Sequence, residues 1–142
     1  MILLDTDHLS VLTDPRHALR VRLLDRLQAY DDLVALPLPT VEEQLRGWLA
    51  LIHRVTDVHR QIVPYRRLAK LMDFLSDWTI IPWDEPAADT FRRLRASRVR
   101  IGTQDLKIAS TAIVHDALLL SANLRDYEQV PGLQVEDWLY GR

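Results

Sequence analysis

Cysteine is absent from the 142 residues of this sequence. Disulfide bonds and thiolate metal ligands are therefore excluded, and the absence fits a reducing cytoplasm, where we expect the protein to remain. Long apolar runs are missing too, because no stretch approaches the roughly 20 apolar residues of a membrane span. The opening MILLDTDHLS lacks the basic region of a secretory signal peptide.

The chain also lacks a strong excess of charge of either sign. Its formal net charge is −2, so any polyanion must be held by local basic patches or by metal ions rather than by the whole molecule. Hydrophobic residues make up 48% and charged residues 27% of the chain, which is typical of a globular protein. Because no internal repeat, low-complexity segment or linker is present, we expect residues 1–142 to form a single domain.

The first ten residues contain the most informative stretch. Residues 1–4 are all apolar and predict a strand that is buried on both faces of a sheet. Polar residues follow, beginning with the carboxylate of Asp5, where the chain should turn into a helix. In open α/β sheets, chemistry gathers beyond the carboxyl ends of the strands, where the strand order reverses. Asp5 therefore occupies a position suited to an active-site acid.

Strands and helices alternate along the rest of the chain. Further strands are predicted at 33–38, 78–82, 117–121 and 133–135. Helices are predicted at 7–13, at 16–30 and at 40 to about 55. A second part of this last helical region runs from about 55 to about 78, and two more helices begin at 84 and at 103, the last ending near 115. Asp84 and Thr103 are the predicted caps of the last two helices. This alternation predicts an α/β fold with a short, mainly parallel five-stranded sheet flanked by helices.

Four polar residues beyond Asp5 fall where a predicted strand ends or a helix begins. They are Glu43, Asp105, Asn123 and Asp126. Each has a structural explanation when taken alone: Glu43 completes a capping box with Thr40, and Asp105 complements a helix dipole. Because a parallel sheet brings all of them to one edge, coincidence is the weaker account.

Four stretches of the chain carry a resemblance to a known family. They are ILLDTDHLS at 2–10, TVEEQLRG at 40–47, IGTQDLKIASTA at 101–112 and LLSANLRDY at 119–127. The chain resembles the PIN-domain ribonucleases, specifically the VapC type of toxin, from residue 1 to about 138. The Gly-x-x-Asp-x-x-Ile-Ala and Asn-x-x-Asp-aromatic blocks are the specific parts. The resemblance implies a three-layer α/β domain.

The resemblance places the acidic positions of the family on Asp5, Glu43 and Asp105. The four-residue step from Glu43 to Gly47 selects Glu43 over its neighbour Glu42. These assignments are what the resemblance implies for this chain.

The fourth position of the family falls on Asn123, where related domains often have Asp. Asp126 follows three residues later, so either residue can complete the site. At Asp7 the family more often has Asn. Its carboxylate can add charge to a metal site or cap the first helix, and we expect the cap.

Crowded carboxylates predict a divalent cation, because like charges raise one another's pKa and a cation relieves that conflict. All-oxygen ligands favour Mg²⁺ or Mn²⁺ over zinc. We expect Asp5 and Asp105 to be direct metal ligands. Glu43, helped by Asn123 or Asp126, would hold a second metal or orient the attacking water. Such a centre supports in-line phosphodiester hydrolysis, and the resemblance implies RNA as the substrate.

A basic cluster precedes the Asp105 stretch and has no acid between its members. It consists of Arg92, Arg93, Arg95, Arg98 and Arg100. The cluster can form a phosphate-binding wall that positions RNA with salt-dependent affinity. The alternative is a solvated helix face, which is the commoner role of a charged face.

The resemblance also implies partners, namely a second copy in a homodimer and a cognate antitoxin that covers the acids. Two other functions remain open from the residues. Asp5-x-Asp7 after an apolar strand also resembles the first motif of haloacid-dehalogenase-type phosphatases, with Asp5 as nucleophile, although no acidic pair follows the strand at 117–121. A non-catalytic interaction module on a degenerate nuclease fold is supported only by Asn123.

Overall fold

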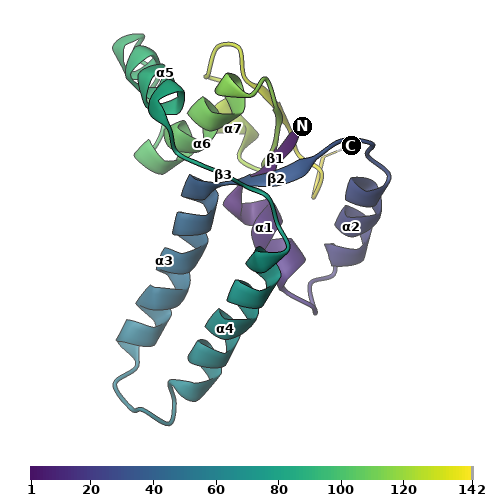
Figure 1. Cartoon of the computed structure of the whole chain (residues 1–142), viewed down its shortest axis with the longest axis vertical. Coiled ribbons are helices and arrows are strands. Elements are labelled where there is room, and N and C mark those ends of the chain that lie inside the picture. The colour runs from purple at the N-terminus through teal and green to yellow at the C-terminus, as the bar shows by residue number, and fades with distance from the viewer. Residues whose placement is uncertain (142) are drawn as a thin grey trace.

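The computed structural model describes residues 1–141, which form seven helices and five strands (Figure 1). The strands are β1 (Ile2–Leu4), β2 (Val34–Pro37), β3 (Ile80–Ile81), β4 (Leu118–Leu120) and β5 (Gln134–Glu136). The helices are α1 (Thr6–Thr13), α2 (Arg20–Gln28), α3 (Leu38–Arg54), α4 (Ile62–Ser76), α5 (Glu85–Ala96), α6 (Thr103–Val114) and α7 (Leu124–Tyr127). Within this described range, no helix has the length and apolar character needed to cross a bilayer.

The five strands form one sheet in the order β3-β2-β1-β4-β5, and every neighbouring pair is parallel. The predicted α/β fold with a five-stranded sheet is therefore confirmed. β1 lies in the centre, with β2 on one side and β4 on the other. The strand order reverses between β1 and β4, so the carboxyl ends of these two strands border the place where open α/β sheets bind ligands.

Both faces of the sheet are covered by helices, which confirms the predicted three-layer arrangement. Alternate residues of β1 point to opposite faces: Ile2 and Leu4 pack with α1 to α4, whereas Leu3 packs with α5 to α7. All three side chains are fully buried. Each such burial contributes about 2 kcal/mol, so the central strand is fixed firmly at the point where it delivers Asp5.

Helices α3 and α4 form a long hairpin that extends away from the sheet (Figure 1). Only part of this hairpin is packed against the core, through residues such as Val41 and Leu71. Several apolar side chains elsewhere on it and in its connecting loop are exposed, among them Leu49, Val58 and Val63. The hairpin therefore offers apolar surface that the described residues do not cover.

Several predicted element boundaries are wrong. The second helix begins at Arg20 rather than residue 16, because Asp14, Pro15 and the next residues form a turn. The third strand contains only Ile80 and Ile81, and the fifth strand lies one residue later than predicted. Pro64 lies in the first turn of α4, where proline is tolerated.

Two predicted caps are also wrong, while one is confirmed. The third helix begins at Leu38, so Thr40 is no cap; its buried hydroxyl donates instead to the carbonyl of Leu4 at 2.9 Å. Gly102, rather than Thr103, is the N-cap of α6. Asp84 caps α5 as predicted, accepting a hydrogen bond from the Ala87 N–H. The Thr40 bond ties the start of α3 to the end of β1, which places the two elements' acids on one edge.

Candidate active site

The candidate site begins at Asp5, directly after β1. Asp5 is buried, with 5% of its surface exposed. Its Oδ1 accepts a hydrogen bond of 2.7 Å from the Thr6 N–H, so Asp5 is also the N-cap of α1. Its Oδ2 accepts a bond of 2.7 Å from the Ser121 hydroxyl, which follows β4. The two central strands thus orient one buried carboxylate together.

Two further acids converge on Asp5. Glu43 comes from the second turn of α3, and Asp105 lies in the first turn of α6. One carboxylate oxygen from each of the three acids lies within 4.8 Å of the other two. Glu43 is held by the Thr6 hydroxyl, which donates to its Oε2 at 2.5 Å. The sequence prediction that these three acids meet at one edge of the sheet is therefore met by the geometry.

Burial and the charge of neighbouring acids make Asp5 and Asp105 costly to ionise. Burial, followed by the charge of Asp7, raises the pKa of Asp5 from 3.8 to about 6, although hydrogen bonds from Ser121 and Thr6 oppose this. Burial, followed by the charge of Glu43, also raises the pKa of Asp105. A cation bound beside these two carboxylates would favour their ionised forms.

Asn123 and Asp126 both lie near the three acids, but only Asn123 forms a hydrogen bond with one of them. The Asn123 amide donates to Asp105 Oδ2 at 3.3 Å and to Asp126 Oδ2 at 3.1 Å. Asp126 is not among the acids whose oxygens lie within 4.8 Å of one another. Asn123 is therefore the nearer neighbour of Asp105, and it links Asp126 to the cluster.

Asp7 does not cap the first helix, contrary to the prediction, because Asp5 is the N-cap. The Asp7 side chain reaches across to the turn after β4, where its Oδ2 accepts a bond of 2.8 Å from the Ala122 N–H. The Ser121 hydroxyl lies 3.3 Å from the same oxygen. Asp7 therefore adds negative charge beside Asp5 and fastens β1–α1 to the β4–α7 turn.

Tyr127 also belongs to the site, and its contact with an acid was not predicted from the sequence. It is the largest fully buried side chain, and its hydroxyl donates to Asp105 Oδ1 at 3.4 Å. Burial, and then the charges of Asp5 and Asp105, raise the pKa of Tyr127 above its usual range. The phenol therefore stays protonated as a donor. Its only sequence signal was the aromatic residue that ends the Asn-x-x-Asp-aromatic block.

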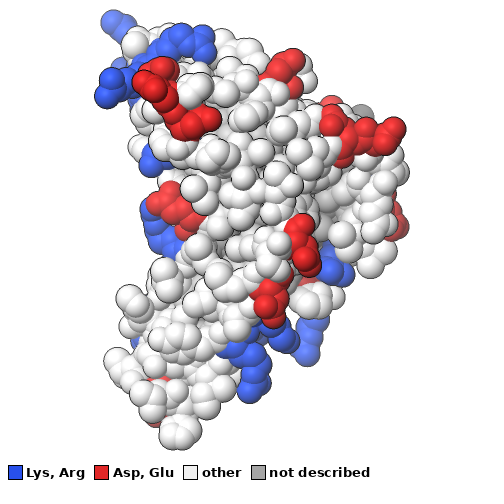
Figure 2. All heavy atoms as spheres, viewed as in Figure 1, with Lys and Arg blue, Asp and Glu red and all other residues white. Residues whose placement is uncertain are grey.

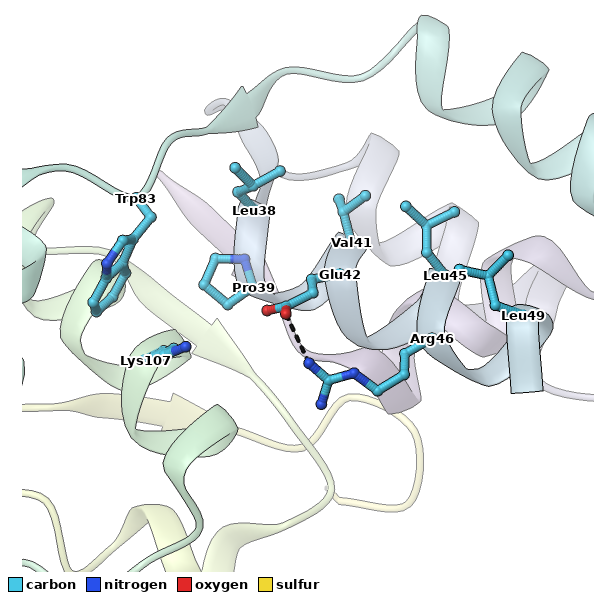
Figure 3. Close-up of a pocket in the computed structure, with 9 residues that line it drawn as sticks. All are labelled: Leu38, Pro39, Val41, Glu42, Leu45, Arg46, Leu49, Trp83 and Lys107. Carbon is cyan, nitrogen blue, oxygen red and sulfur yellow. Dashed lines mark hydrogen bonds and ion pairs between the residues drawn. The ribbon is translucent and has the colours of Figure 1, made fainter.

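Glu42 lies outside the cluster, on an apolar groove of about 510 Å³ beside α3 (Figure 3). It pairs with Arg46 at 2.7 Å and accepts a bond of 2.8 Å from Gln104. The groove is lined by Leu38, Pro39, Val41, Glu42, Leu45, Arg46, Leu49, Trp83 and Lys107. The choice of Glu43 over Glu42 as the site acid agrees with this geometry.

In the basic cluster, Arg95 forms hydrogen bonds within the protein, whereas the other four arginines are exposed. Arg95 donates to the carbonyls of Val99 and Ile101, each at 3.0 Å, and so holds the loop between α5 and α6. Arg92, Arg93, Arg98 and Arg100 are exposed. Basic side chains gather at the α5 end of the molecule, with acidic ones beside them (Figure 2). Arg95 therefore shapes the loop that leads to Asp105.

The PIN domain family profile matches residues 2–133. This chain belongs to the PIN domain family. A tRNA(fMet)-specific endonuclease VapC from Salmonella typhimurium is 30% identical over 94 residues, which are 63% of this chain and 71% of that protein. Ribonuclease VapC2 from Haemophilus influenzae is 35% identical over 80 residues, 54% of this chain and 61% of that protein. The second match thus spans less than two thirds of its relative.

The fold is shared with solved structures. VapBC2 from Rickettsia felis, determined with a DNA fragment from its promoter, has a TM-score of 0.76 at 24% identity over 97% of this chain and 99% of that chain. This likeness and the family match overturn the alternative of a haloacid-dehalogenase-type phosphatase. The cluster of Asp5, Glu43 and Asp105 therefore lies within a PIN domain.

Proposed function

We propose that this PIN domain is a metal-dependent endoribonuclease and the toxin of a toxin–antitoxin pair. The observation that carries the proposal is the convergence of Asp5, Glu43 and Asp105, whose oxygens lie within 4.8 Å of one another. The names of the relatives, a tRNA endonuclease and a ribonuclease, support RNA as the substrate class. Retention of all three acids argues against a non-catalytic module.

The residues of the site fit a hard divalent cation. They offer carboxylate oxygens and no sulfur, which suits Mg²⁺ or Mn²⁺. Burial and neighbouring carboxylates raise the pKa of Asp5 and Asp105, so a cation beside them would favour their ionised forms. Asp5 and Asp105 would hold the cation, which when bound lowers the pKa of water and neutralises charge on phosphoryl oxygens.

The remaining side chains position the acids. The Ser121 hydroxyl fixes one oxygen of Asp5, and the Thr6 hydroxyl fixes one oxygen of Glu43. Glu43 is only partly buried, and in this proposal it would hold a second metal or orient the attacking water. Asn123, and Asp126 through it, complete the side of the site next to Asp105.

We further propose that exposed arginines near the start of α6 hold the RNA backbone. Arg92, Arg98 and Arg100 are exposed, and Arg98 and Arg100 lie in the loop that leads to the Asp105 helix. Phosphate contacts from this loop would position RNA without reading its sequence. Arg95 acts indirectly in this scheme, by holding the loop.

A cognate antitoxin and a second copy of the chain are the proposed protein partners, and the cytoplasm is the proposed compartment. The solved neighbours include VapBC complexes from Rickettsia felis and Salmonella typhimurium. Exposed apolar side chains on α3, α4 and their connecting loop, such as Leu49 and Val63, supply surface that partners can cover.

The proposal is tested by chelation and restoration with protein that is free of antitoxin. Cleavage of a panel of structured RNAs should be lost in EDTA and return when Mg²⁺ or Mn²⁺ is supplied in excess. Cleavage that persists unchanged after exhaustive chelation would refute the proposed mechanism.

A further inference from the structure

His8 is a buried titratable residue to which the mechanism above assigns no role. It lies in α1 directly after Asp7, and none of its surface is exposed. A fully buried histidine needs partners for both ring nitrogens, and here both have one. Its Nδ1 lies 2.6 Å from Asp7 Oδ1, and its Nε2 lies 3.2 Å from the backbone nitrogen of Trp138.

The Trp138 contact determines which ring nitrogen carries the proton. A backbone N–H can only donate, so Nε2 of His8 must accept through its lone pair. The ring is therefore neutral and its proton sits on Nδ1, where it is donated to Asp7. Nδ1 is thus the donor and Nε2 the acceptor.

Trp138 is itself held in place by α2 and the residues that follow it. The guanidinium of Arg26 lies 4.3 Å from the centre of its ring, and Tyr30 packs edge-on at 5.9 Å. Its indole N–H also donates to Glu136 at 2.7 Å. His8 therefore bonds a residue that contacts with Arg26, Tyr30 and Glu136 hold in place.

The other ring nitrogen of His8 contacts the Asp7 carboxylate, which in turn bonds the turn after β4. Asp7 Oδ1 faces the imidazole, which leaves Oδ2 aimed at the Ala122 N–H and the Ser121 hydroxyl. The Asn123 N–H in turn donates to the Ser121 oxygen at 3.0 Å. One line of hydrogen bonds thus runs from His8 to the turn that carries Asn123.

We infer that His8 is a positioning residue: as the neutral Nδ1–H tautomer, it holds Asp7 against the Ser121–Ala122 turn and so fixes the acidic site for its cation. This role rests on the proposed function, because it concerns the same site. Removal of a side chain that supports metal ligands through hydrogen bonds typically lowers metal affinity by about 10- to 100-fold.

Two amide variants separate the contacts of His8. In His8→Asn, the amide nitrogen replaces Nδ1 and can still donate to Asp7, but the Trp138 N–H loses its acceptor. In His8→Gln, the amide oxygen reaches the position of Nε2 and can serve Trp138, but the side-chain donor to Asp7 is lost, and only the backbone N–H of residue 8 still donates to Asp7 Oδ1. Exposed His53 supplies the matched control, His53→Gln.

Mn²⁺ titrations of the full chain, followed by electron paramagnetic resonance, should then show opposite defects. His8→Gln should bind Mn²⁺ about tenfold more weakly, whereas His8→Asn should keep wild-type affinity and show the larger fall in melting temperature. His53→Gln should change neither property. Equal losses of affinity in the two His8 variants, or no loss in His8→Gln, would overturn the positioning role.

The tautomer can be read directly in the wild-type protein, which keeps the inference testable even if a variant misfolds. Long-range ¹H–¹⁵N correlation spectra at neutral pH should show His8 protonated on Nδ1 alone, assigned by comparison with the spectrum of His8→Gln. A ring protonated on Nε2, or on both nitrogens, would overturn the inference. Failure of the wild type to bind Mn²⁺ would instead count against the proposed function while leaving this readout intact.

Discussion

Ser121 and Asp5 are 116 positions apart in the chain, yet the Ser121 hydroxyl donates a 2.7 Å hydrogen bond to Asp5 Oδ2 inside the protein. The contact exists because β1 and β4 are parallel neighbours that end together, with Leu4 paired to Leu120. Each strand therefore delivers its next residue to the same point. The pairing of β1 with β4 thus brings two residues of the site into direct contact.

Replacement of Ser121 by alanine should weaken metal binding without unfolding the protein. The variant removes a donor that favours the ionised form of Asp5, so Mn²⁺ affinity should fall about tenfold. Ser110→Ala is the matched control, because Ser110 is equally buried but bonds only the Leu106 carbonyl within α6. Calorimetric titration of both variants with Mn²⁺ measures the difference, and equal affinities would count against the role of Ser121.

The pH dependence of stability should reveal the cost of ionising Asp5 in the absence of metal. The pKa of Asp5 is about 6 in the folded protein, against an ordinary value of 3.8. Between these values the folded state binds more protons than the unfolded state, so stability falls as the pH rises through this window. The shift corresponds to as much as about 3 kcal/mol.

Asp5→Asn should therefore be more stable than the wild type in EDTA at about pH 8, and this advantage should vanish near pH 4. The asparagine oxygen can still accept one of the two hydrogen bonds that Asp5 receives. Urea unfolding at both pH values gives the two free energies. A variant that is less stable than the wild type at the higher pH would contradict the predicted cost of ionising the buried Asp5.

Tyr127→Phe should separate the hydroxyl contact with Asp105 from the packing of the ring. Loss of this donor should lower Mn²⁺ affinity by about tenfold and stability by about 1 kcal/mol. Tyr65→Phe, in an exposed position on α4, should change neither quantity. Metal titration and thermal unfolding of the two variants test this, and an unchanged affinity for Tyr127→Phe would assign the hydroxyl a purely structural role.

Arg100→Gln should weaken RNA binding and reduce its salt dependence. If Arg100 contacts one phosphate, the slope of log affinity against log salt should fall by about 1. The measurement is best made with Asp105→Asn as the background, so that the RNA stays intact. Arg22→Gln on α2 is the control, since α2 packs on the opposite face of the sheet from α5 and α6. Equal slopes for the two arginine variants would show that Arg100 does not contact the RNA backbone.

Much of the site could be predicted from the sequence, because a parallel sheet ends all its strands at one edge. That rule alone brought Asp5 together with Asn123 and Asp126, and helix starts near the same edge added Glu43 and Asp105. The contacts that orient these acids followed less easily. The Thr40 hydroxyl bonds Leu4 rather than its own helix, which depends on tertiary packing that local capping rules do not describe.

The roles of Tyr127 and His8 were not predictable for a related reason. Tyr127 reaches Asp105 and His8 reaches Trp138 only after the helices have packed on the sheet. A buried aromatic or histidine looks the same in sequence whether it merely fills the core or also bonds an acid. Asp7 was misassigned as a cap because one of its two carboxylate oxygens bonds the Ala122 N–H, 115 positions away.

The most direct test of the central claim compares neighbouring acids in one cleavage assay. Wild type, Asp105→Asn, Glu43→Gln and Glu42→Gln, each freed of antitoxin, are incubated with structured RNA and Mg²⁺ or Mn²⁺. We predict that Asp105→Asn and Glu43→Gln lose at least about 100-fold in cleavage rate, whereas Glu42→Gln, whose carboxylate faces Arg46 and Gln104, stays within about twofold of wild type. Wild-type rates in Asp105→Asn and Glu43→Gln, or an equal loss in Glu42→Gln, would contradict the assignment of the acidic cluster as the nuclease site.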